Sequence, residues 1–185
     1  RNLNHTVVDG VRLVFNVVDW EHTEVETEGG SKHLGTAFDN RTYVLRAEVD
    51  QRQTARLAGK FGVWTQARDF VAVGEEALAP PTDQTSFAAF VYEELELGRY
   101  RVQLGGRLER NSYAVLPRAA LETESAGSPG APVASPVRDR DFNGNSVSAG
   151  LQTDLGSHTA FVTNLTRSHR APALEELYNF GPHVG

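Results

Sequence analysis

The sequence contains no cysteine and no methionine. Without cysteine the chain can form no disulfide, no thiolate zinc site and no cysteine nucleophile. Because methionine is missing even at position 1, we expect a segment of a longer translation product rather than a whole protein. The longest uninterrupted apolar run, Phe87 to Tyr92, has six residues. That is far short of the ~20 residues that a membrane-spanning helix needs.

Positive charge is also scarce. The chain has 18 basic residues against 24 acidic ones, a net charge of -6, and its only lysines are Lys32 and Lys60. A nucleic-acid surface needs clustered excess positive charge, so we expect no nucleic-acid partner. Hydrophobic residues make up 39% of the chain, which is ordinary for a folded protein and excludes disorder along the whole length.

What the sequence does have is alternation. Apolar and polar residues alternate along most of the chain, a period of two that is typical of β-strands with one apolar face. In residues 99–109, for example, Leu104 and Leu108 occupy even positions whereas Arg101 and Arg107 occupy odd ones. The pattern predicts seven strands, at Val11–Glu21, Tyr43–Val49, Arg56–Trp64, Thr85–Glu94, Arg99–Glu109, Ser146–Leu155 and His158–Thr166.

The predicted connections alternate in length. Asp50–Ala55, Leu95–Gly98 and Gly156–Ser157 are short turns, whereas His22–Thr36, Thr65–Gln84 and Arg110–Asn145 are long loops. A transmembrane β-barrel keeps short turns on one rim and long loops on the other, while a soluble sandwich needs no such asymmetry. Strands of about ten residues tilted by ~45° rise roughly 23 Å, close to the ~25 Å apolar band of these barrels. We therefore predict an all-β fold, an antiparallel transmembrane β-barrel segment with long extracellular loops.

Aromatic and charged residues support the same prediction. Six aromatic residues lie at or near predicted strand ends, where a barrel places its aromatic girdles: Trp20, Tyr43, Trp64, Phe87, Tyr100 and Tyr113. The charged residues of the polar stripes are expected to line a water-filled interior: Arg46, Glu48, Lys60, Arg99, Arg101, Arg107 and Glu109.

One stretch departs from the β pattern. In Ala171–Tyr178, Pro172 suits a first helical turn, and Leu174, Leu177 and Tyr178 have helical spacing. We predict a short helix there. The Ser-, Gly-, Pro- and Ala-rich stretch Ser125–Pro136 is interpreted as a loop tip.

The sequence offers no catalytic motif. It lacks the Gly-x-Ser-x-Gly elbow, a phosphate-binding Gly-rich loop and His-Glu-x-x-His. Residues 139–144 match the first half of an EF-hand loop, but its twelfth position is Gly150 where Glu is required. Adjacent carboxylates occur at 75–76, 93–94 and 175–176, but neighbours in sequence point to different sides of a strand, so a shared-proton dyad is unsupported. We interpret them as loop and lumen charges. We expect no enzymatic activity.

Three motifs resemble those of TonB-dependent outer-membrane receptors. They are Arg170-Ala-Pro-Ala-Leu-Glu-Glu-Leu-Tyr-Asn-Phe-Gly-Pro-His183, Asp69-Phe-Val-Ala-Val-Gly-Glu-Glu-Ala-Leu-Ala-Pro-Pro-Thr82 and Gly105-Gly-Arg-Leu-Glu109. The resemblance extends from Val11 to Gly185. It implies a bacterial outer-membrane receptor with a 22-stranded barrel and an N-terminal plug. Residues 1–185 would then be a partial barrel domain without the plug and the C-terminal strands. The implied partners are outer-membrane lipid and, through the plug, the TonB complex.

The Gly-Pro-His ending resembles the branch of this family that takes up zinc or related metal species. In that branch a Glu after an upward strand and the His of this motif hold the metal, and plug residues complete the shell. The matching positions are Glu24 and His183. His22 and His33, in the same predicted loop as Glu24, are further candidates for substrate binding. Imidazole nitrogen and carboxylate oxygen suit zinc.

Zinc, or an iron chelate such as a siderophore, would be the transported ligand, and no resident cofactor is expected. Two other classes remain open from the residues alone. One is a soluble β-sandwich binding module, whose apolar stripes would pack against each other. The other is a passive porin-like channel, which would bind no specific ligand.

Overall fold

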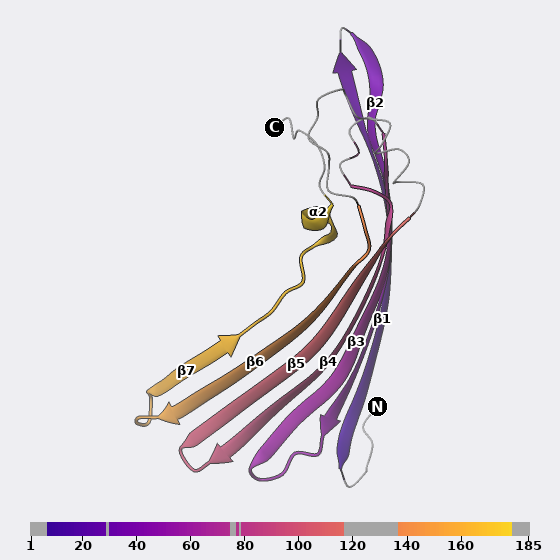
Figure 1. Cartoon of the computed structure of the whole chain (residues 1–185). Helices are drawn as coiled ribbons and strands as arrows, with labels where there is room; N and C mark the ends of the chain where they lie inside the picture. Colours follow the sequence, from indigo (N-terminus) through magenta and orange to yellow (C-terminus); the bar gives the residue numbers. More distant parts are fainter. Residues whose placement is uncertain (1–6, 29, 75–76, 78, 117–136, 179–185) are drawn as a thin grey trace.

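The computed structural model describes residues 7–28, 30–74, 77, 79–116 and 137–178. These form one seven-stranded antiparallel sheet in which every strand pairs only with its neighbours in sequence (Figure 1). The strands are β1 (Val8–Glu28), β2 (Ser31–Gln51), β3 (Leu57–Val73), β4 (Thr82–Leu97), β5 (Tyr100–Val115), β6 (Arg140–Asp154) and β7 (Ala160–Arg167). The predicted all-β fold and its seven strands are confirmed.

The sheet has two chemically different faces, because successive side chains of a strand point to opposite sides. The register sets Phe61 of β3 beside Val91 of β4, and the face that carries them is termed the apolar face. The opposite face carries Arg46 and Arg107 and is termed the polar face. On the polar face Arg46 donates to Glu48 at 2.6 Å and Arg107 to Glu109 at 2.7 Å, so the predicted grouping is confirmed for these four charges.

Within the described residues no second layer covers the apolar face. Its large side chains are exposed, with 69% of Leu13, 62% of Phe15 and 67% of Leu108 accessible. A soluble sandwich would pack such side chains against a second sheet. In the described residues this exposure fits the predicted barrel, whose apolar side faces lipid, and does not fit the soluble-sandwich alternative. As for helices, none in the described ranges is long and apolar enough to cross a membrane.

The short turns all lie at one edge of the sheet, as predicted (Figure 1). They connect β2 to β3 over 52–56, β4 to β5 over 98–99 and β6 to β7 over 155–159. Gly98 has a φ of 65°, a conformation that glycine adopts without strain and that the tight turn between β4 and β5 requires.

The predicted long loops are shorter than expected at the opposite edge. The prediction of a loop over His22–Thr36 is wrong, because β1 and β2 stay paired up to Glu28 and Ser31. The loops predicted over 65–84 and 110–145 are replaced in part by strand, and the connections run over 74–81 and 116–139. Beyond the lipid both faces of a strand meet water, so the side-chain alternation fades while the backbone ladder continues.

The aromatic residues divide between the two faces. Tyr43, Phe87 and Tyr100 lie on the apolar face and are 37%, 50% and 38% exposed, as expected of girdle residues. The same prediction is wrong for Trp20, Trp64 and Tyr113, which lie on the polar face. Each of these residues is an even number of positions along its strand from the charged residues of the polar face. Residues spaced in this way point to the same face of a sheet.

A small core lies on the polar face near the long-loop edge. The helix α2 (Leu174–Leu177) places its apolar side against β3 and β5 there, and the predicted helix is confirmed. The buried residues of this core are Phe70, Ala72, Tyr113, Leu174 and Tyr178. The stretch Ser125–Pro136 lies outside the described residues.

Candidate functional site

His22 and Glu24 lie two residues apart on the polar face of the β1–β2 hairpin. The His22 Nε2 atom is 3.8 Å from the Glu24 Oε1 atom. About half of each side chain is exposed, 50% and 52% respectively. The two side chains therefore present an imidazole nitrogen and a carboxylate oxygen to the same solvent space, which suits a divalent metal or a polar chelate.

The ring of His22 is held by aromatic neighbours. It stacks on Trp20 with ring centroids 5.6 Å apart and on Phe38 with centroids 6.1 Å apart. The ring centroids of Phe38 and Phe70 are 6.4 Å apart, and the Arg68 guanidinium lies 4.9 Å from the Phe70 ring centroid. Stacking and cation–π contacts fix ring orientation, so the His22 ring is oriented by an aromatic row that crosses three strands.

The sequence prediction missed this aromatic row. Phe70 fell in the predicted loop Thr65–Gln84, and Phe38 fell between the predicted loop His22–Thr36 and the predicted strand Tyr43–Val49, so neither could be assigned a face. Residue numbering along β1 could have placed Trp20 and His22 on the polar face. Both are an even number of residues from Arg12, and Arg12 pairs with Glu48 on that face.

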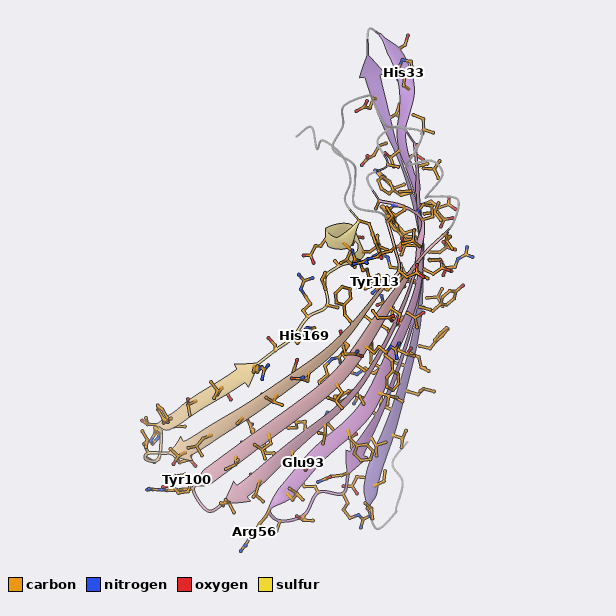
Figure 2. The ribbon with its side chains drawn as sticks, in the orientation of Figure 1. His33, Arg56, Glu93, Tyr100, Tyr113 and His169 are labelled. Atoms are coloured by element: carbon orange, nitrogen blue, oxygen red, sulfur yellow. The ribbon has the colours of Figure 1, made fainter. Side chains whose placement is uncertain are left out.

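His33 reaches the same face because of a β-bulge. Glu24 is opposite Thr36, but Val25 is opposite Leu34, so Gly35 is an extra residue in β2. The bulge sets His33 opposite Glu26, and Glu26 follows Glu24 on the polar face. Figure 2 shows His33 near the tip of the hairpin. The register thus places His22, Glu24 and His33 on one face, with His33 about 13 Å further along the ladder than His22.

These residues do not form a complete metal site by themselves. In the described ranges no group of three or more His, Asp or Glu side chains is arranged to hold a metal ion. His183, the other predicted metal ligand, lies outside the described residues. The described part of the chain therefore offers two adjacent ligand atoms, and a metal held there would need ligands from elsewhere.

Three polar contacts anchor α2 to the sheet below the hairpin. Tyr113 donates its hydroxyl hydrogen to the Pro172 carbonyl at 2.7 Å, and Tyr178 donates to the Arg138 carbonyl at 2.9 Å. Arg68 forms an ion pair of 2.9 Å with Glu175. Figure 2 shows Tyr113 next to α2. Since Arg68 also lies over Phe70, the helix and the aromatic row share one arginine.

The first turn of α2 is capped by Glu176. Its carboxylate accepts a hydrogen bond from the Ala173 backbone N–H at 2.7 Å and contacts Arg170 at 2.8 Å. These contacts, led by the Arg170 hydrogen bond, lower the pKa of Glu176. The cap is half of a capping box, because Ala173 has no side-chain oxygen to return the bond.

The lowered pKa of Glu176 predicts an acid-sensitive cap. A carboxyl group whose pKa is lowered by folding contributes stability at pH values above its ordinary, unfolded-state pKa. This contribution is lost as the pH falls through the folded-state pKa. Hydrogen exchange at the Ala173 amide of the full-length receptor should therefore speed up on acidification, after correction for the intrinsic rate. Glu176→Gln should exchange faster at neutral pH and lose the acid response. Glu175→Gln, which removes the Arg68 ion pair but keeps the cap, should retain it. An unchanged acid response in Glu176→Gln would disprove the assignment.

Lower on the polar face the side chains enclose a small hollow. It measures about 200 Å³ and is lined by Arg46, Trp64, Phe90 and Arg107. The Arg46 guanidinium lies 5.2 Å from the Phe90 ring centroid, and that of Arg107 lies 5.6 Å from the Trp64 ring centroid. Each arginine thus contacts one aromatic ring and one carboxylate, an arrangement that needs water or another polar group on its open side.

The sheet, its lipid-type surface and its charged face fit one known family. The family model described as TonB dependent receptor-like, β-barrel matches residues 3–185. The chain belongs to the TonB-dependent receptors. No curated protein sequence matches the chain.

Membership of the TonB-dependent receptors settles the class of function. Receptors of this family lie in the bacterial outer membrane and take up nutrients by a TonB-dependent process, and they are transporters rather than enzymes. The predictions of outer-membrane location, of a TonB partner and of no enzymatic activity are thereby confirmed. The apolar face of the sheet is the lipid-facing side of the barrel, and the polar face lines its interior.

Proposed function

We propose that the receptor containing this chain takes up a metal ion, with zinc as the first candidate, or a metal chelate such as a siderophore. The observation that carries the proposal is the pairing of His22 Nε2 with Glu24 Oε1 at 3.8 Å on the polar face of the β1–β2 hairpin. An imidazole and a carboxylate are common ligands of zinc in proteins. Neither group is enclosed, so an incoming ligand has direct access to both.

In this proposal Glu24 and His183 are the metal ligands, and His22 and His33 assist in capturing the substrate. The aromatic row supports the assignment, because Trp20 and Phe38 hold the His22 ring beside Glu24. A ligand site gains affinity when its side chains are oriented before binding. We further propose that residues 1–185 form part of a larger barrel, with a plug that supplies the remaining ligands.

Calorimetric titration of the full-length receptor tests the proposal. Zn²⁺ and a ferric siderophore are titrated separately into the wild type, His22→Ala and Glu24→Gln. Loss of one charged ligand contact is worth about 1.5–3 kcal/mol, so each variant should bind its substrate roughly tenfold more weakly or worse. His158→Ala is the matched control, because His158 lies at the short-turn edge beside Ser157.

The outcomes separate the alternatives. Saturable zinc binding that weakens in both variants supports a metal-ion receptor, and the same pattern with the ferric siderophore alone supports a chelate receptor. No saturable binding of either ligand would contradict the proposal and point to a substrate of another class. Binding that survives in both variants but is lost on replacement of other residues would show that the β1–β2 hairpin is not the capture site.

A further inference from the structure

Towards the short-turn edge, the apolar face carries a carboxylate among apolar side chains. From residue 87 onwards, the residues of β4 that point to this face are Phe87, Ala89, Val91, Glu93, Leu95 and Leu97. Glu94 belongs to the polar face, where it accepts a hydrogen bond from Gln103 and pairs with Arg101. The interpretation of Glu93 as a loop or lumen charge is therefore wrong, because adjacent residues of a strand face opposite sides. In an outer-membrane barrel Glu93 faces lipid.

Glu93 has a specific setting on this face. The register aligns Gln51 of β2, Gly59 of β3 and Glu93 of β4 in one row across three strands. Gln51 donates from Nε2 to the Glu93 Oε2 atom at 2.9 Å. The bond spans the middle strand because Gly59 has no side chain, and a Cβ atom built there would collide with Oε2 of Glu93. The carboxylate therefore lies across the backbone of β3.

This direction takes the carboxylate towards the short-turn edge. Gln51 is the last residue of β2, whereas Glu93 is four residues above the end of β4 at Leu97. The amide that holds the carboxylate therefore lies at the short-turn edge itself. Figure 2 shows Glu93 close to that edge, in the region of Arg56 and Tyr100. The half-buried carboxylate thus reaches the level at which lipid headgroups begin.

The chemistry of the row calls for a cation. An ionised carboxylate accepts several hydrogen bonds, and Gln51 supplies one from a neutral amide. The flanking side chains Leu57, Leu95 and Leu104 are apolar and 38%, 36% and 54% exposed, so they suit acyl chains. A charge at a lipid boundary is stabilised by an ionic hydrogen-bonding partner.

We propose that Glu93 and Gln51 bind the ammonium headgroup of a phospholipid of the phosphatidylethanolamine type, in the leaflet at the short-turn edge. The ammonium donates to the Glu93 carboxylate, and the acyl chains lie along the apolar face beside Leu57 and Leu95. The site is separate from ligand capture on the β1–β2 hairpin and does not depend on the substrate proposed above.

Native mass spectrometry of the full-length receptor tests this site. The receptor is equilibrated in mixed micelles with phosphatidylethanolamine, phosphatidylglycerol or phosphatidylcholine of identical acyl chains, and the retained lipids are counted. The wild type should retain phosphatidylethanolamine about tenfold over phosphatidylglycerol, the ratio expected for one hydrogen-bonded charge pair. Phosphatidylcholine should be retained less well, because its headgroup is cationic but has no N–H donors.

Three variants identify the residues responsible. Glu93→Gln should abolish the preference, and Gln51→Leu should weaken it while keeping the charge, because leucine cannot donate the hydrogen bond that holds the carboxylate at this edge. Glu96→Gln is the matched control, since Glu96 lies on the polar face of the same strand and pairs with Arg101 at 2.8 Å. If Glu93→Gln assembles poorly, Gln51→Leu carries the test.

Several results would overturn the proposal. A wild type without preference for phosphatidylethanolamine contradicts it directly, as does a preference that survives both Glu93→Gln and Gln51→Leu. Equal loss in Glu96→Gln would show a general effect of charge. Receptor dimers that depend on Glu93 and exclude lipid would assign this face to a second copy of the receptor instead.

Discussion

Tyr178→Ala is expected to release α2 from the interior of the barrel while the sheet stays intact. Tyr178 and Leu174 are each only 1% exposed, and they supply the part of the core that comes from the helix. Truncating a buried aromatic side chain costs about 3–5 kcal/mol, more than a single turn of helix can replace by its own hydrogen bonds. Hydrogen exchange of residues 170–178 in the full-length receptor should rise to that of an unstructured segment.

Tyr178→Phe is the matched control for this release. It keeps the ring and removes only the hydrogen bond to the Arg138 carbonyl, a loss of about 1 kcal/mol. Burial already raises the pKa of the Tyr178 hydroxyl, so this group is neutral at physiological pH in the docked state. The strands should keep their protection in both variants. Equal exchange in Tyr178→Ala and Tyr178→Phe would mean that the core does not hold the helix.

Leu108→Arg is expected to impair assembly of the receptor into the membrane. Leu108 lies on the apolar face and is 67% exposed, and its neighbours across the strands are Ala89 and Asn145. An arginine on the lipid side of a barrel costs about 2–4 kcal/mol at the bilayer midplane and less towards the interfaces, and Leu108 lies between the two, one position on this face below Arg110, which pairs with Phe87. The urea midpoint of the receptor in lipid vesicles should fall, and less folded receptor should be recovered from outer membranes.

Gln103→Arg on the same strand provides the comparison. Gln103 lies on the polar face and donates to Glu94, so an arginine there meets a carboxylate and water. Its effect should stay below ~1 kcal/mol. If Leu108→Arg were as well tolerated as Gln103→Arg, the apolar face would not contact lipid, and the barrel orientation deduced from the alternation would be reversed or wrong.

The sequence predicted the strands best where lipid and interior make opposite demands on neighbouring residues. Leu104 and Arg107 show why, since each residue type is tolerated on only one face within the membrane. The prediction failed above the membrane, where Glu21 to Glu28 are mostly polar on both sides and only the backbone ladder defines the strand. Apolar and polar side chains alternate along a strand only when its two faces have different surroundings, and the alternation disappears where both faces contact water.

The candidate site was predictable only in part, for a related reason. His22 and Glu24 are two residues apart, so any extended conformation places them together. His33 needed the bulge at Gly35 to reach their face, and a single extra residue leaves no distinct mark in the sequence. The contact between Arg68 and Glu175 joins residues 107 positions apart. Such a pairing depends on the packing of α2 and cannot be derived from local patterns.

The continuous β1–β2 hairpin changes how capture of a ligand is expected to work. Each arm has 21 residues, so at ~3.3 Å per residue it is about 70 Å long, roughly twice what a tilted strand needs to cross the apolar band. A flexible loop loses conformational entropy when it closes on a bound ligand, and this loss costs roughly 1–2 kcal/mol of free energy for each residue fixed. The paired residues of the hairpin have already lost that freedom on folding, so His22 and His33 hold their positions in the ladder before any ligand binds.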